Sequence, residues 1–426
     1  MPARPARKNL MRRRAFLKQL AALAGTSALG GCAGAPSAGR PKPAGVLGSN
    51  DRIRLGVIGC GNLGFAHHIP KLMELSKDPR MNVELAAVCD IYEPRKQRAK
   101  ARTGAALFHD YRKMLDRRDI HGVVIVTPDH WHAKMAIDAM EAGKDVHVEK
   151  PMTLYWEEAR QVYETAVRTR RVVQVGAEGT SRDVYWQANR LIREGKIGKP
   201  VWATGGVYRN DPAGDWNWPM DPDCSPKNLD WDAFLGPAPK RPFDPERYFR
   251  YRKYWDYSGG VAHDLIAHTL SALQICMGAE FPKRVSAAGG IYVHHDRETP
   301  DTFSMQVEYP SQYLATLFCT QTTESGVSFA IRGEKGTITF SPNKEIPGKV
   351  YVKPEPPFVK EMQELTVTEQ PRPDHDVNFI ECMRTRAETA CPPLTGYKIM
   401  VALALAVRSY REGKMFTFDP VRQEIV

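Results

Sequence analysis

A glycine-rich turn between an apolar strand and a helix constrains the fold more than any other feature of this chain. Residues 52–58 predict a strand, and residues 59–64 follow it with the spacing Gly-x-Gly-x-x-Gly. Residues 65–75 predict the next helix, and residues 83–89 predict a second strand that ends at Asp90. This order of strand, turn, helix, strand and acid is typical of a βαβ unit that binds a dinucleotide.

The three glycines of the turn have separate physical roles. Gly59 permits the tight turn, Gly61 lets the backbone approach a pyrophosphate, and Gly64 allows the helix to pack closely on the strand. Free N–H groups at the helix N-terminus attract the phosphates. The turn residues expected to bind the dinucleotide are Gly59, Cys60, Gly61, Asn62, Leu63 and Gly64.

Asp90 indicates which dinucleotide binds. A carboxylate at the end of the second strand can accept hydrogen bonds from both ribose hydroxyls and would repel a 2′-phosphate. Asp90 lies further past the glycines than the usual ~20 residues, and a polar insert at residues 77–80 accounts for the extra length. The expected cofactor is NAD, although Arg95 could soften the preference over NADP.

Alternating helix and strand patterns continue along the next part of the chain. Further apolar strands are predicted at residues 122–127, 145–148 and 172–176. This repetition predicts a doubly wound parallel sheet, in which ligands bind beyond the carboxyl ends of the strands. The residues expected beside the cofactor at two of these strand ends are Thr127, Pro128, His132, Glu149 and Lys150.

Three short motifs occur in order along the chain. They are Thr127-Pro128-Asp129-His130-Trp131-His132, Glu149-Lys150-Pro151, and a Gly259-Gly260 pair followed by Asp264 and His268. Together they resemble the Gfo/Idh/MocA family, named for glucose–fructose oxidoreductase and inositol dehydrogenase, although the first motif has Asp where the family commonly has Asn. The resemblance covers nearly all of residues 51–426. It implies a second α/β domain whose large open sheet covers the nicotinamide and mediates assembly into a homo-oligomer.

The same resemblance implies a catalytic set of Lys150, Asp264 and His268. On a helix, a spacing of four residues places Asp264 and His268 on one face. A histidine is suited to accept a hydroxyl proton near neutral pH, and a lysine can stabilise the charge of a developing alkoxide. Asp264 could orient the imidazole or bind a substrate hydroxyl. The alternative interpretation is an ion pair on a helix surface beside an ordinary solvated lysine.

Residues 202–257 are rich in aromatic side chains, with 13 in the segment. Prolines and glycines interrupt it, which predicts a long loop region that folds over the site. Aromatic rings suit the apolar faces of sugars, whereas nine acidic residues against eight basic ones disfavour nucleic acid. A core or subunit-interface patch is the alternative. The residues expected to contact a carbohydrate substrate are Lys150, Tyr254, Trp255, Tyr257, Asp264 and His268.

No metal site is predicted. His294, His295 and Asp296 are adjacent in sequence, and adjacent ligands rarely converge on one ion. His67 and His68 begin the first helix and are interpreted as structural. The eight cysteines form no Cys-x-x-Cys pair, which argues against zinc and thioredoxin-type motifs.

The N-terminal segment carries most of the positive charge. The chain of 426 residues has a formal net charge of +11, and residues 1–31 contain seven basic residues and no acidic one. The remainder is therefore close to neutral, which gives no strong electrostatic case for nucleic acid. Arg13 and Arg14 precede Phe-Leu-Lys and a short apolar run, an order that resembles a twin-arginine signal read by the Tat export machinery.

The cleavage point of this signal has two interpretations. Residues 29–32 resemble a lipoprotein box in which Cys32 carries a lipid anchor, and residues 33–35 resemble an ordinary cleavage site. Either would place the protein in the periplasm or, as a lipoprotein, on a membrane. The expected domains are a signal in 1–35, a flexible linker in 36–50, an NAD-binding domain in 51–177 and a substrate and oligomerisation domain in 178–426.

The expected fold is α/β, with an N-terminal Rossmann domain and a C-terminal α+β domain that holds a large open, mostly antiparallel sheet. Export would favour a cofactor that stays bound and returns to its starting redox state in every cycle. We therefore expect oxidation of a sugar or polyol coupled to reduction of a second carbonyl. The alternatives are a glycosidase that works by oxidation, elimination and re-reduction, and a non-catalytic sugar-binding protein.

Overall fold

The computed structural model describes residues 51–342 and 345–426. The expected signal, Cys32 and the linker lie outside these residues. Within the described ranges, no helix has the length and apolar character needed to cross a membrane. The seven cysteines in these ranges are all free thiols.

The N-terminal half is built around a parallel sheet. Its strands are β1 (Ile53–Ile58), β2 (Val83–Cys89), β3 (Ala106–Phe108), β4 (Gly122–Ile125), β5 (Asp145–Glu149) and β6 (Val173–Gly176). They lie in the order β3-β2-β1-β4-β5-β6, so the winding direction reverses between β1 and β4. β4, β5 and β6 are buried along their whole length, as expected for parallel strands covered on both faces. The predicted doubly wound parallel sheet is confirmed.

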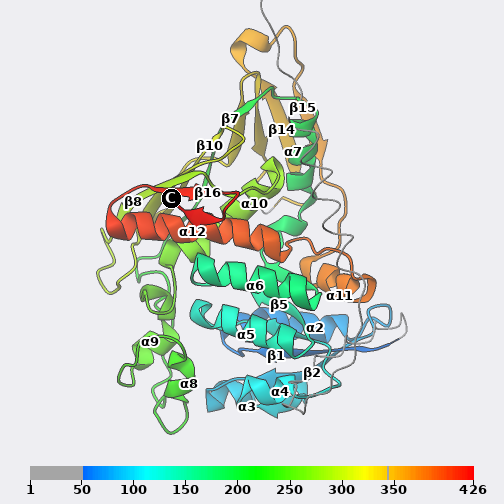
Figure 1. Ribbon diagram of the computed structural model, residues 1–426, viewed down its shortest axis with the longest axis vertical. Coiled ribbons are helices and arrows are strands. Elements are labelled where there is room, and N and C mark those ends of the chain that lie inside the picture. Colours follow the sequence, from blue (N-terminus) through cyan, green and yellow to red (C-terminus); the bar gives the residue numbers. More distant parts are fainter. Residues whose placement is uncertain (1–50, 343–344) are drawn as a thin grey trace, which may run out of the picture. The chain divides into compact units, whose positions relative to one another are not determined.

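Helices pack around this sheet (Figure 1). They are the π-helical turn η1 (Gly64–His68), α2 (Ile69–Leu75), α3 (Glu93–Thr103), α4 (Tyr111–Leu115), α5 (Asp129–Glu141), α6 (Trp156–Thr169) and, from late in the chain, α11 (His375–Thr385). α5 begins at Asp129, directly after Pro128, whose backbone is extended. The first helix is also not uniform, since the π-helical turn η1 precedes α2.

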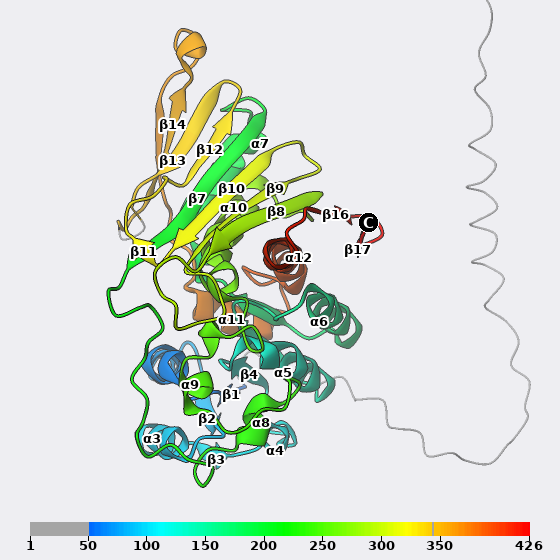
Figure 2. The same cartoon turned by 90° about the vertical axis from the view of Figure 1, so that its left-hand side faces the viewer.

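The C-terminal half contains a second, larger sheet. In the described chain its strands are β7 (Pro200–Asn210), β8 (Arg284–Gly290), β9 (Thr302–Glu308), β10 (Leu314–Thr320), β11 (Thr322–Thr323), β12 (Ala330–Gly333), β13 (Gly336–Phe340), β14 (Lys349–Pro354), β15 (Leu365–Thr368), β16 (Phe416–Asp419) and β17 (Glu424–Ile425). β7 and β10 pair in parallel at the centre, and the other pairs are antiparallel. Figure 2 shows β7, β10, β9 and β8 side by side. The prediction of a large, mostly antiparallel sheet is confirmed.

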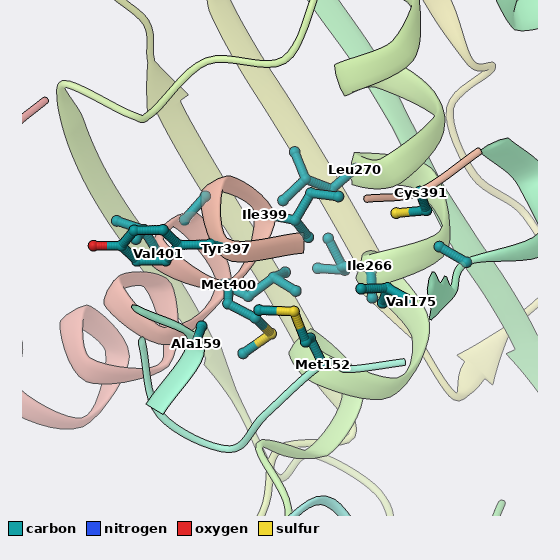
Figure 3. Close-up of a cluster of buried hydrophobic side chains, with 14 of the residues drawn as sticks. Met152, Ala159, Val175, Ile266, Leu270, Cys391, Tyr397, Ile399, Met400 and Val401 are labelled. Atoms are coloured by element: carbon teal, nitrogen blue, oxygen red, sulfur yellow. The ribbon is translucent and has the colours of Figure 1, made fainter. Parts of the chain in front are cut away.

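Helices α7 (Asp183–Arg193), α10 (Ala267–Met277) and α12 (Pro393–Glu412) accompany this sheet, and the π-helical turn η4 (Ala262–Ile266) precedes α10. The core is continuous between the two halves, because Met152 and Val175 from the first half meet Ile266 and Met400 from the second (Figure 3). Gly396 on α12 permits this contact: a Cβ there would lie 2.7 Å from Val175 Cγ2. α12 therefore holds the two sheets in one packed unit.

Residues 211–257, the connecting segment, link β7 to η4 and pack against the N-terminal sheet. The segment contains α8 (Trp231–Leu235), α9 (Pro245–Phe249) and the short turn η3 (Tyr251–Lys253). Backbone hydrogen bonds join Glu93 N to Asn228 O at 2.8 Å and Asp230 N to Ile91 O at 3.2 Å. The aromatic stretch is thus not one loop, since residues 200–210 form β7. Its remainder has a core of its own, formed with Tyr92 by Leu229, Phe234, Leu235, Tyr248 and Tyr257.

Candidate active site

A cavity of about 500 Å³ lies at the carboxyl ends of β1, β4, β5 and β6. Its walls come from the N-terminal sheet, the connecting segment, η4 and α10. The predicted site residues that line it are Gly59, Gly61, Asn62, Leu63, Asp90, Thr127, Pro128, His132, Glu149, Lys150, Asp264 and His268. Residues far apart in the sequence therefore converge on one space.

The glycine turn leaves no room for side chains at two of its three glycines. Gly59 has a φ of +99°, and a Cβ there would lie 2.4 Å from Val126 O. At Gly64 a Cβ would lie 2.0 Å from Gly59 O, because the helix packs directly on the turn. Gly64 and Cys60 are buried behind the cavity wall. The half-buried backbone at Gly61, which lines the cavity, and the N-terminus of η1 fit a bound pyrophosphate.

Asp90 is fixed at the end of β2 by the backbone around it. Its Oδ2 accepts a hydrogen bond from Cys60 N at 2.7 Å, and its Oδ1 accepts one from Tyr92 N at 2.9 Å. The carboxylate is therefore oriented before any ligand binds, with its remaining lone pairs available for ribose hydroxyls. This arrangement fits the adenosine half of a dinucleotide.

Arg95 closes the same end of the cavity together with the connecting segment. Its Nη1 donates a hydrogen bond to the Tyr248 hydroxyl at 2.8 Å. Its guanidinium also lies 4.7 Å from the centre of the Tyr248 ring and 5.2 Å from that of Phe249. All three residues line the cavity, so the connecting segment forms part of its wall.

Lys150, Asp264 and Arg252 form an ion-paired group on the opposite wall, which we name the lysine cluster. Lys150 Nζ donates to Asp264 Oδ1 and to its backbone O, both at 2.8 Å. Arg252 Nε donates to the same Oδ1 at 3.0 Å. Burial by itself would raise the pKa of Asp264, but Arg252 and Lys150 hold that pKa well below its usual range. Two cations thus share one carboxylate, and the cluster carries a net positive charge.

His268 lies on the cavity wall beside this cluster. It is exposed to the cavity, although protein surrounds it on its other sides. Burial, and secondly the charge of Lys150, lower the pKa of His268 to about 4. None of the hydrogen bonds among the described residues engages its ring nitrogens. At neutral pH the imidazole is uncharged and free to accept a proton.

His132 connects the two strand-end motifs. Its Nε2 lies 2.7 Å from Thr127 O and its Nδ1 lies 2.7 Å from Pro151 O. The ring therefore bridges the loops that follow β4 and β5. This contact holds Lys150 in a fixed position relative to Thr127 and Pro128.

The structure does not bring Tyr254, Trp255 or Tyr257 to the cavity. Tyr257 is fully buried in the core of the connecting segment. Trp255 faces α12, with its ring 6.3 Å from that of Tyr410, and the ring of Tyr254 lies under the Arg247 guanidinium. Consecutive residues in an irregular segment point in different directions, and adjacency in sequence to η4 does not decide which of them faces the cavity.

Other residues line the substrate end and were not identified from the sequence. They are Glu178, Arg209, Trp216, Trp218, Tyr251 and Arg252. Trp216 is 3% exposed and has a φ of +71°, a conformation that bulky residues rarely adopt and that is found at functional sites. The two tryptophans belong to the aromatic stretch, which therefore supplies part of the cavity wall. No sequence motif identifies Arg252 as a site residue, because only the tertiary fold brings it into contact with Asp264.

Two family models match the chain. One, described as an oxidoreductase family with an NAD-binding Rossmann fold, matches residues 53–177. The other, described as the C-terminal α/β domain of that oxidoreductase family, matches residues 187–426. The chain belongs to the Gfo/Idh/MocA family. Its N-terminal sheet is accordingly an NAD-binding domain, in agreement with the glycine turn and with Asp90.

Three known proteins illustrate the similarity, one over part of the sequence and two in their fold. An alpha-N-acetylgalactosaminidase from Shewanella oneidensis is 37% identical over 146 residues, which are 32% of this chain and 30% of the relative. The WlbA dehydrogenase from Bordetella pertussis, solved with NADH and UDP-GlcNAcA, is 21% identical with a TM-score of 0.64, covering 87% of this chain and 99% of that chain. An aldose-aldose oxidoreductase from Caulobacter crescentus is 18% identical with a TM-score of 0.65, covering 86% and 100%. The two structures show a shared fold.

Proposed function

We propose that this protein oxidises a secondary hydroxyl group of a sugar or polyol, with NAD that stays bound and is restored in each cycle. The observation that carries the proposal is the position of Lys150, Asp264 and His268 on the wall of the cavity that also holds the glycine turn. Bound NAD supplies a hydride acceptor. Membership of an oxidoreductase family supports the same class of reaction.

Lys150 is placed to stabilise a substrate oxygen. Its ammonium has three donors, and Asp264 occupies two of them. The third donor can bind the reacting hydroxyl and stabilise the negative charge that grows on it. Asp264 and Arg252 position the ammonium and touch the cavity beside it.

His268 accepts the hydroxyl proton. The imidazole would hold that proton while the substrate carbinol becomes a carbonyl, and NAD held by the glycine turn and Asp90 would supply the hydride acceptor. In a redox-neutral cycle His268 would return the proton to the oxygen of a second carbonyl substrate. His268 suits this role because it is neutral at physiological pH and has no competing hydrogen bond within the described part of the chain.

The connecting segment supports retention of the nucleotide. Tyr248, Phe249 and Phe234 line the cavity from one side while the glycine turn lines it from the other. Besides the two backbone hydrogen bonds to residues 91–93, the Phe234 carbonyl accepts from Trp131 Nε1 at 2.9 Å. Release of a bound dinucleotide would require this packed segment to move away.

A glycosidase that acts by transient oxidation is the second candidate. A partial relative is named an alpha-N-acetylgalactosaminidase, and such a reaction needs a further acid or base near the oxidised carbon. Glu178 supplies a carboxylate on the cavity wall, and its hydrogen bond with His67 lowers its pKa. After oxidation, a base there could remove the acidified C–H proton and permit elimination.

The twin-arginine segment leads us to propose export of the folded, cofactor-loaded protein, as a periplasmic protein or a lipoprotein anchored at Cys32. Fractionation of cells tests this proposal, with an Arg13→Lys, Arg14→Lys variant that should remain in the cytoplasm. Cys32→Ser distinguishes the anchor, because the variant should leave the membrane fraction only if Cys32 carries lipid. Unchanged location in both variants would contradict export by this route.

The decisive experiment uses protein purified without added cofactor. We expect one nicotinamide nucleotide per chain after denaturation, and a near-ultraviolet nicotinamide band that changes when the right sugar is added. Free sugar released from a glycoside without net NADH would favour the glycosidase. Empty protein that turns over only with added NAD, and releases NADH, would contradict the redox-neutral cycle.

A further inference from the structure

A second group of polar side chains lies buried behind Glu149, on the far side of the strand end from Asp264. It consists of His68 from η1, His147 and Glu149 from β5, and Asp376 from α11, and we name it the histidine cluster. His68 and His147 are each 1% exposed. The three elements that contribute these residues come from widely separated parts of the chain.

The donor atoms of this cluster have the spacing of metal ligands. His68 Nε2 lies 2.9 Å and His147 Nε2 lies 3.8 Å from Glu149 Oε1. The ligating atoms of these three residues all lie within 4.8 Å of one another. Ligands at about 2.1 Å from a tetrahedral ion are separated by about 3.4 Å, which falls between the two distances.

His147 has no hydrogen-bond partner that explains its burial. Neither of its ring nitrogens makes a hydrogen bond to any described residue. Its neighbours include the rings of His375 and Phe379, and the nitrogens of His375 are already engaged by Ser181 Oγ at 2.8 Å and Val175 O at 2.9 Å. Buried polar groups are nearly always paired, so the free Nε2 that faces Glu149 indicates a missing ligand.

The charges of the cluster also call for a cation. Glu149 and Asp376 are two buried carboxylates, while the Lys150 ammonium points to Asp264. A single protonated imidazole would leave one carboxylate charge unbalanced and both ring nitrogens of His147 without a hydrogen bond. A divalent ion bound by two neutral imidazoles would balance both carboxylates.

Asp376 supplies a carboxylate next to the second ring nitrogen of His68. Its Oδ1 lies 3.8 Å from His68 Nδ1, the nitrogen that does not face Glu149. Metal-bound histidines usually donate their second N–H to a carboxylate, which fixes the ring. The other oxygen of Glu149 accepts from Lys150 N at 3.1 Å, so an ion here would also hold the backbone from which Lys150 extends.

We propose that His68, His147 and Glu149 bind a divalent transition-metal ion of the zinc type, with Asp376 orienting His68. Two imidazole nitrogens and one carboxylate oxygen are a ligand set that zinc accepts. The ion is structural: it joins η1, β5 and α11 behind the cavity. This site does not depend on the proposed reaction, because no step of that reaction uses the ion.

The test measures metal content and stability of the full chain. Chelator-treated wild-type protein is titrated with Zn²⁺ by calorimetry, and metal in freshly purified protein is measured by mass spectrometry. We expect one equivalent of metal, a single tight site and a higher Tm with Zn²⁺. Wild-type protein that contains no metal and shows no saturable Zn²⁺ binding would overturn the proposal.

His147→Phe is the informative variant, and His375→Gln is its matched control. His147 makes no hydrogen bond that the phenylalanine would lose, so without a metal site this variant would be as stable as the wild type or more so. With the site, it loses the metal and the Zn²⁺-dependent rise in Tm, while His375→Gln keeps both. Metal bound equally by wild type and His147→Phe would be adventitious and would overturn the proposal. If His147→Phe fails to fold, the wild-type titration decides alone.

Discussion

The lysine cluster and the histidine cluster lie on either side of the Glu149–Lys150 strand end and differ in the balance of their charged groups. In the lysine cluster two cations share the Asp264 carboxylate through contacts of 2.8–3.0 Å, and the surplus positive charge faces the cavity. The histidine cluster contains two buried carboxylates and neither lysine nor arginine, and His147 makes no hydrogen bond to any described residue. Surplus positive charge is useful where an alkoxide develops, whereas surplus negative charge in a closed site requires a cation.

Removal of the Lys150 ammonium should have the largest effect on turnover. Lys150→Met keeps the length of the side chain and loses the donor to the reacting oxygen. We expect kcat to fall by about 10³-fold, the order of magnitude found when a charge-stabilising donor is lost. Single-turnover reduction of the bound nicotinamide measures it, with nucleotide content as the control. A rate within threefold of wild type would remove Lys150 from the chemistry.

His268→Gln should lower turnover by about 10²–10³-fold, because general-base catalysis contributes on that order. The pH profile sharpens the assignment. The pKa of His268 is lowered to about 4, so the imidazole is charged below that pH and neutral above it. Wild-type kcat/KM should therefore rise through about pH 4 and level off, and the variant should lose this limb. A variant with the same limb would assign it to another group.

Arg252→Ala should break the lysine cluster without touching Lys150. Loss of one partner leaves the Asp264 carboxylate with Lys150 as its sole cation, and breaking a buried pair costs about 3–5 kcal/mol at the upper end, less here because Arg252 is partly exposed. We expect a lower Tm and a lower kcat, with partial recovery in Arg252→Lys. A chemical denaturation curve and a pH–rate profile measure the two effects. Equal loss in both variants would mean that a long side chain with a positive charge does not replace the guanidinium.

Removal of metal by a chelator should destabilise the histidine cluster and leave the lysine cluster unaffected. Prolonged dialysis against a strong chelator should lower the Tm, because the proposed ion joins η1, β5 and α11. Scanning calorimetry with and without added Zn²⁺ measures the change. An unchanged Tm after complete removal of the metal would contradict a structural ion.

Tyr248→Phe should have the smallest effect. The variant removes one hydrogen bond to Arg95, worth about 0.5–1.5 kcal/mol, and keeps the ring that faces the guanidinium. Nucleotide should be released roughly 2–10-fold faster, with turnover of the retained nucleotide unchanged. Release into a large excess of a nucleotide-binding competitor gives the rate. No change would mean that the adenosine wall is held by packing alone.

Local patterns were sufficient for much of the fold and of the nucleotide end of the site. Strand β2 was predicted at its observed bounds, because an apolar run between polar segments has few other ways to be buried. The glycine turn was predicted because its requirement is local: the φ of Gly59 and the contact of Gly64 arise within one supersecondary unit.

Such local patterns could not predict which distant residues the tertiary fold brings together. Arg252 reaches Asp264 only because η3 turns back under η4, and His68, His147 and Asp376 meet only after three elements pack together. The expectation that Tyr254 to Tyr257 face the substrate relied on nearness in sequence, and an irregular segment has no periodicity to assign a direction. The same segment brought Trp216 and Trp218 to the cavity instead.

Each cluster includes one residue from a π-helical turn: His68 is in η1 and Asp264 is in η4. Such a turn contains one residue more than an α-helix would use, and each residue of an α-helix rotates the chain by about 100°. A relative that lacks one residue at either place would keep an unbroken helix and still turn its acid or imidazole away from the cluster. At these two positions we therefore expect a gap of a single residue in an alignment to disrupt the cluster, even where every named side chain is retained.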